Sequence, residues 1–271
     1  LQGAPTVLNL PFDRPRPALQ SYQGATHHFV LDTALTASLR ALAAAQATPT
    51  TLFMLLSAAF NVLLYRHSGQ NDICIGLPIA NRQQQALEGL IGFFANTLVL
   101  RTRLDGAASF QNLLAQVRHD MLDAFAHQDL PFEKLVEALK PERHTSHAPL
   151  FQVMLSLQDS ASGTIDLPGL QLAPLQIDSS VAKFDLTLSL AEEQGHMLAG
   201  FEYNTDLFDS STIERWAGHF TNLLQAIVAQ PQQAIGRLPL LGQAELQQVT
   251  VEWNRTAYAT PDVTPDATPD A

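Results

Sequence analysis

The apolar run at residues 52–64, LFMLLSAAFNVLL, limits the fold of this chain more than any other stretch. Its 13 residues are too few to span a bilayer and suit a buried helix. We predict that this helix begins at Pro49 and runs to about Arg66, where Ser68-Gly69 stops it. A helix buried on all sides needs a large core, and a chain of 271 residues that is 46% hydrophobic can build one.

Shorter periodic segments surround this helix. Apolar runs and alternations predict strands at residues 26–32, 72–79, 92–104, 148–158, 170–177, 183–192 and 197–204. Apolar residues at three- and four-residue steps predict helices at 33–46, 109–126 and from Pro131, and a final long helix opened by a capping box of Ser211 and Glu214. Helices and strands of comparable number, partly alternating, indicate an α/β fold in the broad sense, a layered α+β arrangement.

Charge and cysteine content exclude several classes of protein. The net charge is −11 and no basic block is present, which argues against a nucleic-acid partner. Cys74 is the single cysteine, so no internal disulfide can form and we expect a reduced, cytoplasmic setting without a membrane span. The N-terminus has neither a signal-peptide pattern nor an initiator Met, and we interpret the chain as a fragment of a longer protein.

The sequence THHFVLDT at residues 26–33 is the most enzyme-like in the chain, because it contains His-His-x-x-x-Asp. In one interpretation this is a loop in which His28 acts as a general base. In the other it is a strand with His28, Val30 and Asp32 on one face, and Asp32 caps the next helix. We favour the strand, because the catalytic form of this pattern has Gly directly after the Asp, where this chain has Thr33. A β-branched residue resists the positive φ that Gly permits.

Other polar residues invite similar comparisons. His144 and His147 have a spacing that could serve zinc, but no carboxylate or thiolate completes a ligand set, so we predict surface histidines and no metal. Asn96 and Thr97 interrupt an apolar strand, and such groups either bond to neighbouring backbone or face a wet channel. For residues 127–129, His-Gln-Asp, we favour a turn between helices in which Asp129 caps the second one.

Several segments together resemble the condensation domains of nonribosomal peptide synthetases. GLIGFFANTLVLR (89–101), HQDLPFEKLV (127–136) and RHTSHAPLFQ (143–152) are similar to three consecutive motifs of that family, in its order and at about its spacings. LPFDRPRP, DICIGLPIANR, KFDLTL (183–188) and FEYNTDLFD (201–209) agree with the family between them, and ELQQVTVEWNRTAY (245–258) resembles the passage to an adenylation domain. The departures are His144, where Asp is usual, and Ala95, where Val is common.

This resemblance implies a domain of two lobes, each like chloramphenicol acetyltransferase, with a tunnel between them. Carrier proteins insert phosphopantetheine arms from both ends, and an amine attacks a thioester to form an amide. The family's His-His-x-x-x-Asp-Gly lies in the first lobe, upstream of the proline-rich crossover, whereas the look-alike here follows LPFDRPRP. The resemblance therefore implies that the chain is the C-terminal lobe alone, with a mixed β-sheet flanked by helices. Such a lobe lacks the catalytic residues and is inactive without the N-terminal lobe.

The same resemblance implies boundaries, residues and partners. The segments are a crossover (1–24), the lobe (25–230), a linker towards an adenylation domain (231–258) and a disordered Thr-Pro-Asp tail (259–271). Candidate channel residues are Phe93, Asn96 and Thr97, and the motif residues are Gln128, Asp129, Arg143 and Pro149. Expected partners are the N-terminal lobe, carrier proteins and an adenylation domain. No cofactor is expected on the chain itself, and self-association is expected when the lobe is isolated. An autonomous CoA-dependent acyltransferase using His28 and a noncatalytic docking module are the alternatives.

Overall fold

The computed structural model describes residues 1–82, 85–158 and 180–255. The strand predicted at 170–177 and the predicted tail at 259–271 lie outside these ranges. Contacts divide the chain into two units, Leu1–Leu240 and Leu241–Ala271. The first unit holds the sheet and its helices. In the described part of the second unit a short helix, α7 (Gln243–Gln247), continues into one π-helical stretch (Gln248–Glu252).

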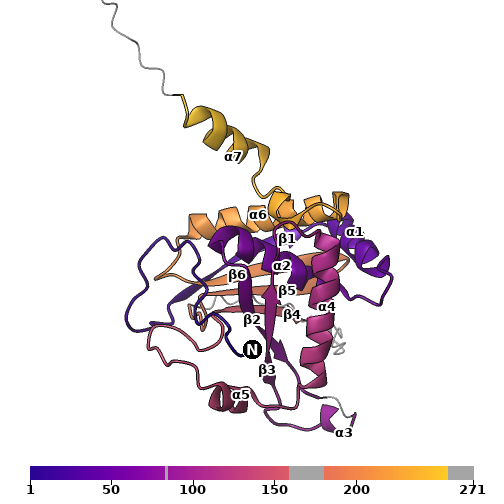
Figure 1. Ribbon diagram of the computed structural model, residues 1–271, viewed down its shortest axis with the longest axis vertical. Helices are drawn as coiled ribbons and strands as arrows, with labels where there is room; N and C mark the ends of the chain where they lie inside the picture. The colour runs from indigo at the N-terminus through magenta and orange to yellow at the C-terminus, as the bar shows by residue number, and fades with distance from the viewer. Residues whose placement is uncertain (83–84, 159–179, 256–271) are drawn as a thin grey trace, which may run out of the picture. The chain divides into compact units, whose positions relative to one another are not determined.

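Six strands form one mixed sheet in the order β1-β6-β5-β4-β2-β3 (Figure 1). β4 pairs in parallel with β2 and β5, and the other neighbours are antiparallel. The strands are β1 (Gly24–Leu31), β2 (Asp72–Ile79), β3 (Asn96–Arg103), β4 (Val153–Gln158), β5 (Leu186–Glu193) and β6 (His196–Asn204). The layered α/β fold with a mixed sheet flanked by helices is confirmed.

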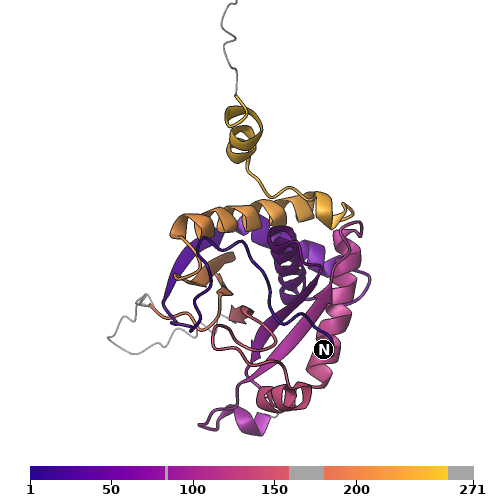
Figure 2. The same cartoon turned by 60° about the vertical axis from the view of Figure 1, so that its left-hand side comes forward.

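Four long helices pack with the sheet, and Figure 2 shows the longest lying across its β1–β6 end. Helix α2 contacts β2, α4 contacts β3, and α1 and α6 contact β6. The helices of the first unit are α1 (Thr33–Ala44), α2 (Leu52–Ser68), α3 (Gln85–Glu88), α4 (Phe110–Ala126), α5 (Phe132–Leu139), α6 (Ser210–Ala229) and a 3₁₀ turn at Ile235–Arg237. No helix among the described residues is long and apolar enough to cross a membrane.

The core lies between the helices and one face of the sheet. Phe60 of α2 packs against Phe201 of β6 at 6.4 Å between ring centroids and against Phe220 of α6 at the same distance. All three rings are fully buried. The apolar run that suggested a helix buried on all sides therefore occupies the centre of this layer, because α2 contacts α1, α4 and α6 as well as the sheet.

Three predicted strand starts are wrong by three to five residues. The strand expected from residue 92 begins at Asn96, and the one expected from 148 begins at Val153. Leu150 has a φ of +68°, which a continuous strand does not allow. The strand expected from 183 begins at Leu186, directly after Asp185. The residues before each of these strands have a strand-like pattern in the sequence, but their backbone forms a loop.

Two predicted helix starts are also wrong. Helix α2 begins after Thr51, whose Oγ1 accepts a hydrogen bond from the Met54 N–H at 3.2 Å, and not at Pro49. In α6 the cap position is Asp209 and Ser211 lies inside the helix, so the capping box does not form. The carboxylate of Asp13 accepts from the Asp209 N–H at 2.8 Å and from the Thr212 hydroxyl at 2.9 Å. The α6 terminus is thus capped by a residue almost two hundred positions away.

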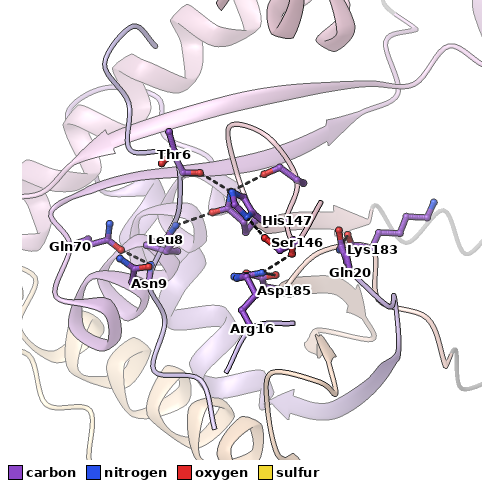
Figure 3. A network of polar contacts seen from close by, with 12 residues as sticks. Thr6, Leu8, Asn9, Arg16, Gln20, Gln70, Ser146, His147, Lys183 and Asp185 are labelled. Atoms are coloured by element: carbon purple, nitrogen blue, oxygen red, sulfur yellow. Dashed lines mark hydrogen bonds and ion pairs between the residues drawn. The ribbon is translucent and has the colours of Figure 1, made fainter. Parts of the chain in front are cut away.

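The proline-rich segment, residues 1–24, is hydrogen-bonded to the rest of the first unit at several points. Arg16 and Asp185 form an ion pair in which the Asp185 side chain is 3% exposed, and Figure 3 shows the two groups facing each other. Gln152 accepts from the Leu8 N–H at 2.9 Å and donates to the Thr6 carbonyl at 3.1 Å. These contacts fix the path of the segment across the domain.

The segment after α6 also belongs to the first unit. Ile235, Leu238 and Leu240 are buried in the core. The Arg66 guanidinium donates to the Leu238 carbonyl at 2.6 Å, and the Asn222 amide donates to the Leu240 carbonyl at 2.9 Å. The first ten residues of the expected linker therefore pack with the lobe, and the contact boundary falls after Leu240.

Candidate functional site

The His-His-x-x-x-Asp sequence forms a strand that runs into a helix. His27 and His28 lie within β1, paired with Phe201 and Gly200 of β6. The Asp32 carboxylate accepts from the Leu35 N–H at 2.7 Å and caps α1. The strand-and-cap interpretation is confirmed. The loop that an autonomous acyltransferase using His28 would need is not formed.

His28 lines a shallow hollow on the sheet face opposite the core. The hollow has a volume of about 290 Å³, and its other polar side chains include Thr26, Ser189 and Glu202. The imidazole folds over Gly200, where an added Cβ would come within 3.3 Å of its Nδ1. Burial raises the pKa of the Glu202 carboxyl. The hollow mixes polar and apolar side chains, and among the described residues no acid in it is hydrogen-bonded to His28.

Asn96 is the first residue of β3, and all the hydrogen bonds of its side-chain amide are to backbone groups. Its Nδ2 donates to the carbonyls of Gln128 and Leu130, both at 2.9 Å. Its Oδ1 accepts from the Thr97 N–H at 2.8 Å and from the Phe132 N–H at 3.0 Å. Of the two alternatives for this polar residue, bonding to neighbouring backbone is the one observed.

Thr97 and Phe93 lie on either side of this contact. Thr97 lines a groove of about 440 Å³ that runs along β3 beside α4 and α5. Phe93 lies in the loop before β3 and is almost fully exposed. The Arg82 guanidinium braces this loop by donating to the carbonyls of Leu87 and Gly92, and it lies 4.4 Å from the centroid of the Phe94 ring.

The motif residues lie in the segments before and after α5. Gln128 and Asp129 lie in the turn before it, as predicted, but Asp129 does not cap the helix, since the cap position is Pro131. The Phe132 N–H that such a cap would serve bonds to Asn96 instead. Arg143 is exposed, and the Pro149 carbonyl accepts from the Phe151 N–H at 2.9 Å.

The two histidines of the RHTSHAP segment stack on each other with ring centroids 4.6 Å apart. His144 is exposed, and His147 is half-buried with its Nδ1 3.0 Å from the Ser146 hydroxyl. Burial and the nearby Arg16 cation lower the pKa of His147. Within residues 1–82, 85–158 and 180–255, no group of three or more His, Cys, Asp or Glu side chains is placed to hold a metal ion.

Sequence reasoning missed the polar pairs that join distant segments. Asp185 stands between Phe184 and Leu186, and a charge in an apolar segment signals a buried partner. That partner, Arg16, is 169 positions away and could not be identified from the sequence. The brace formed by Arg82 has no local signal, because it depends on the fold of the loop.

Comparisons with known proteins agree with the fold and identify the family. The family model described as "Condensation domain" matches residues 1–250. A linear gramicidin synthase of Brevibacillus parabrevis is 52% identical over 261 residues, which cover 96% of this chain and 5% of that protein. Chondramide synthase cmdD of Chondromyces crocatus is 47% identical over 255 residues, covering 94% and 6%. The chain thus spans about a twentieth of these relatives.

Solved structures give the same answer. The X-domain from teicoplanin biosynthesis superposes with a TM-score of 0.80 at 28% identity, over 89% of this chain and 55% of that one. The four-domain nonribosomal peptide synthetase AB3403 superposes with a TM-score of 0.79 at 28% identity, over 89% and 19%. With its chloramphenicol acetyltransferase-like sheet and a family match over nearly its whole length, the chain belongs to the condensation-domain family of nonribosomal peptide synthetases.

Proposed function

We propose that the chain is the C-terminal half of a condensation domain and forms one wall of the tunnel in which amide bonds are made. The observation that carries this proposal is the extent of the structural matches. The chain is covered to 89% by the teicoplanin X-domain, yet it accounts for only 55% of that protein. The unmatched part has the size of a second lobe, in which the proposal places the catalytic histidines.

The reaction is the attack of a carrier-bound amine on a carrier-bound acyl thioester. The nitrogen lone pair forms a bond to the carbonyl carbon, the C–S bond breaks, the thiol departs and the amine loses a proton. The phosphopantetheine arms belong to the carrier proteins, and we assign no catalytic group to this chain. Its contribution is to shape the tunnel, which positions the two arms and excludes water.

An exposed apolar loop supports the half-domain proposal. Leu90 is 51% exposed, Ile91 105% and Phe93 93%, although Arg82 holds the loop in shape. Adjacent apolar side chains on an ordered surface mark an interaction site. We assign this surface to the N-terminal lobe and include Phe93, Asn96 and Thr97 in the tunnel wall.

The remaining parts follow the family. We propose that residues 1–24 are the crossover between the lobes and that the chain after Leu240 leads towards an adenylation domain. Gln128, Asp129, Arg143 and Pro149 shape the segments on either side of α5. The carrier proteins and the adenylation domain are the proposed partners, in the cytoplasm.

The decisive experiment compares the purified chain with the same chain mixed with its N-terminal lobe, using loaded carrier proteins. We expect no amide product from the chain alone and product from the mixture or from the intact domain. Amide product from the chain alone would contradict the half-domain proposal. A chain that binds carriers, while its channel residues have no effect on condensation in the intact domain, would indicate a pure docking module instead.

A second experiment tests the exposed loop. The isolated chain should self-associate in analytical ultracentrifugation or be stabilised by the N-terminal lobe, and replacing Ile91 and Phe93 by Ser should reduce either effect. The control is Leu122→Ser, which changes an exposed leucine on α4. A monodisperse chain that is indifferent to the lobe would contradict the assignment.

A further inference from the structure

Asn96 joins two family motifs that are far apart in sequence. It stands in GFFANTLVLR, and three of its four hydrogen bonds reach the backbone of HQDLPFE. A primary amide offers two donor hydrogens and an acceptor oxygen with two lone pairs. All of them are used here, at distances of 2.8 to 3.0 Å. The amide therefore has no spare hydrogen bond to offer a substrate in this arrangement.

Helix α5 depends on this contact because it cannot satisfy its own first turn. The first N–H groups of a helix need acceptors from outside it, usually a side-chain oxygen at the cap position. The cap residue of α5 is Pro131, whose side chain makes no hydrogen bond. The Asn96 Oδ1 supplies the missing acceptor to the N–H of Phe132, the first helical residue.

The helix also has little else to hold it. It is eight residues long and none of its side chains is fully buried. A helix of this length is marginal without tertiary contacts. Its main ring contact is Phe132 against Phe151, at 5.6 Å between centroids. The Asn96 amide, which binds the turn at Gln128 and Leu130 and the helix at Phe132, fixes both relative to β3.

We propose that Asn96 is a positioning residue that caps α5 from the edge strand and so sets the shape of the groove along β3. The groove of about 440 Å³ is lined by Thr97 and Leu98 on the strand and by Leu130 and Leu135 on the turn and the helix. Asn96 acts on condensation through these neighbours, without contact to the amine or the thioester. The consequence for catalysis rests on the proposed tunnel-wall function, whereas the capping contact does not.

Two substitutions separate the contact from general damage. Asn96→Ala removes all four hydrogen bonds. Asn96→Asp keeps oxygens that can accept from Thr97 and Phe132 but places a carboxylate oxygen against the carbonyls of Gln128 and Leu130. Repulsion between these oxygens favours the protonated acid, which restores one donor, so the Asp variant should recover as the pH falls. Asn9→Ala is the matched control, since Asn9 is exposed and its side chain makes no hydrogen bond within the described part of the chain.

Hydrogen exchange on the full chain tests the contact directly. We expect amide protection across residues 128–139 to fall in Asn96→Ala, to fall at pH 7.5 and return near pH 5 in Asn96→Asp, and to stay unchanged in Asn9→Ala. Unchanged exchange in Asn96→Ala would overturn the proposal, and so would an Asp variant without pH dependence.

Activity of the intact two-lobed domain tests the consequence. A displacement of about 1 Å can cost on the order of 100-fold in rate, so we expect kcat/KM to fall by one to two decades in Asn96→Ala. We expect the Asn96→Asp variant to regain activity relative to wild type over the pH range in which its amide protection returns. Full activity with lost protection would refute the positioning role alone. Lost activity with protection intact would instead indicate direct substrate contact. No amide product from wild type would refute the proposed function and leave the exchange result standing.

Discussion

Acidification should weaken the domain through one half-buried histidine, His67, in the last turn of α2. Its ring stacks on Trp216 of α6 with centroids 4.2 Å apart, and its Nε2 lies 3.3 Å from Nδ1 of His219. Burial, followed by the charges of His219, Arg66 and Arg215, lowers the pKa of His67 from 6.5 to about 4. Burial and neighbouring cations therefore outweigh any benefit of a cation at the helix C-terminus.

The sign and size of the effect follow from this shift. Between pH 6.5 and pH 4 the unfolded chain protonates His67 and the folded chain does not, so stability is full above the unfolded pKa and is lost as the pH falls through this window. For a single site with these two pKa values, the free energy of unfolding decreases by about 2 kcal/mol between pH 7 and pH 5.

Urea unfolding at pH 7, 6 and 5 measures this loss, with fluorescence of the buried Trp216 as the signal. His67→Phe keeps a ring against Trp216 and removes the titration, so its unfolding free energy should fall less with acid, by about 2 kcal/mol over the same range. His119→Gln, at an exposed position on α4, should follow wild type. Equal pH dependence in wild type and His67→Phe would refute the reasoning.

Three further pairs of substitutions test the fold by the same unfolding assay. Asp185→Ala leaves a half-buried guanidinium without its carboxylate and should cost about 3–5 kcal/mol, whereas Glu192→Ala breaks an exposed pair and should cost less than about 1 kcal/mol. Gly76→Ala places a Cβ 2.3 Å from a ring carbon of Phe151 and should destabilise by about 1–3 kcal/mol, while Gly218→Ala meets open space in α6 and should stabilise by up to about 1 kcal/mol. Asp13→Ala should cost about 1 kcal/mol by removing the α6 cap, and Asp13→Asn should lose less; equal losses would argue against capping.

Local sequence patterns predicted a helix, strand or cap correctly where its structure depends on residues that are close in sequence. The helices at 110–126 and 210–229 and the strand at 72–79 follow from apolar spacing, which reports which face is buried. The cap by Asp32 was also predictable, because its partner, Leu35, is three residues away. The capping box of Ser211 and Glu214 failed for the opposite reason, since the acceptor at that terminus comes from the distant Asp13.

The same distinction separates the parts of the site. Motif order identified the family, and periodicity together with Thr33 turned the His-His-x-x-x-Asp sequence into a strand and a cap. For Asn96 the sequence could state only that a polar group in an apolar strand needs partners. Those partners lie 32 to 36 positions away, in a turn whose position no local pattern encodes.

By itself the sequence determined the fold class, most of the helices and strands and the family, because these depend on spacing within a few residues and on ordered motifs. Only the tertiary structure decided how the distant polar groups pair: Asn96 with the turn before α5, Arg16 with Asp185, and Asp13 with the start of α6. The physical reason is that a buried polar group must find a partner wherever the folded chain supplies one, and the sheet brings together residues that the sequence separates.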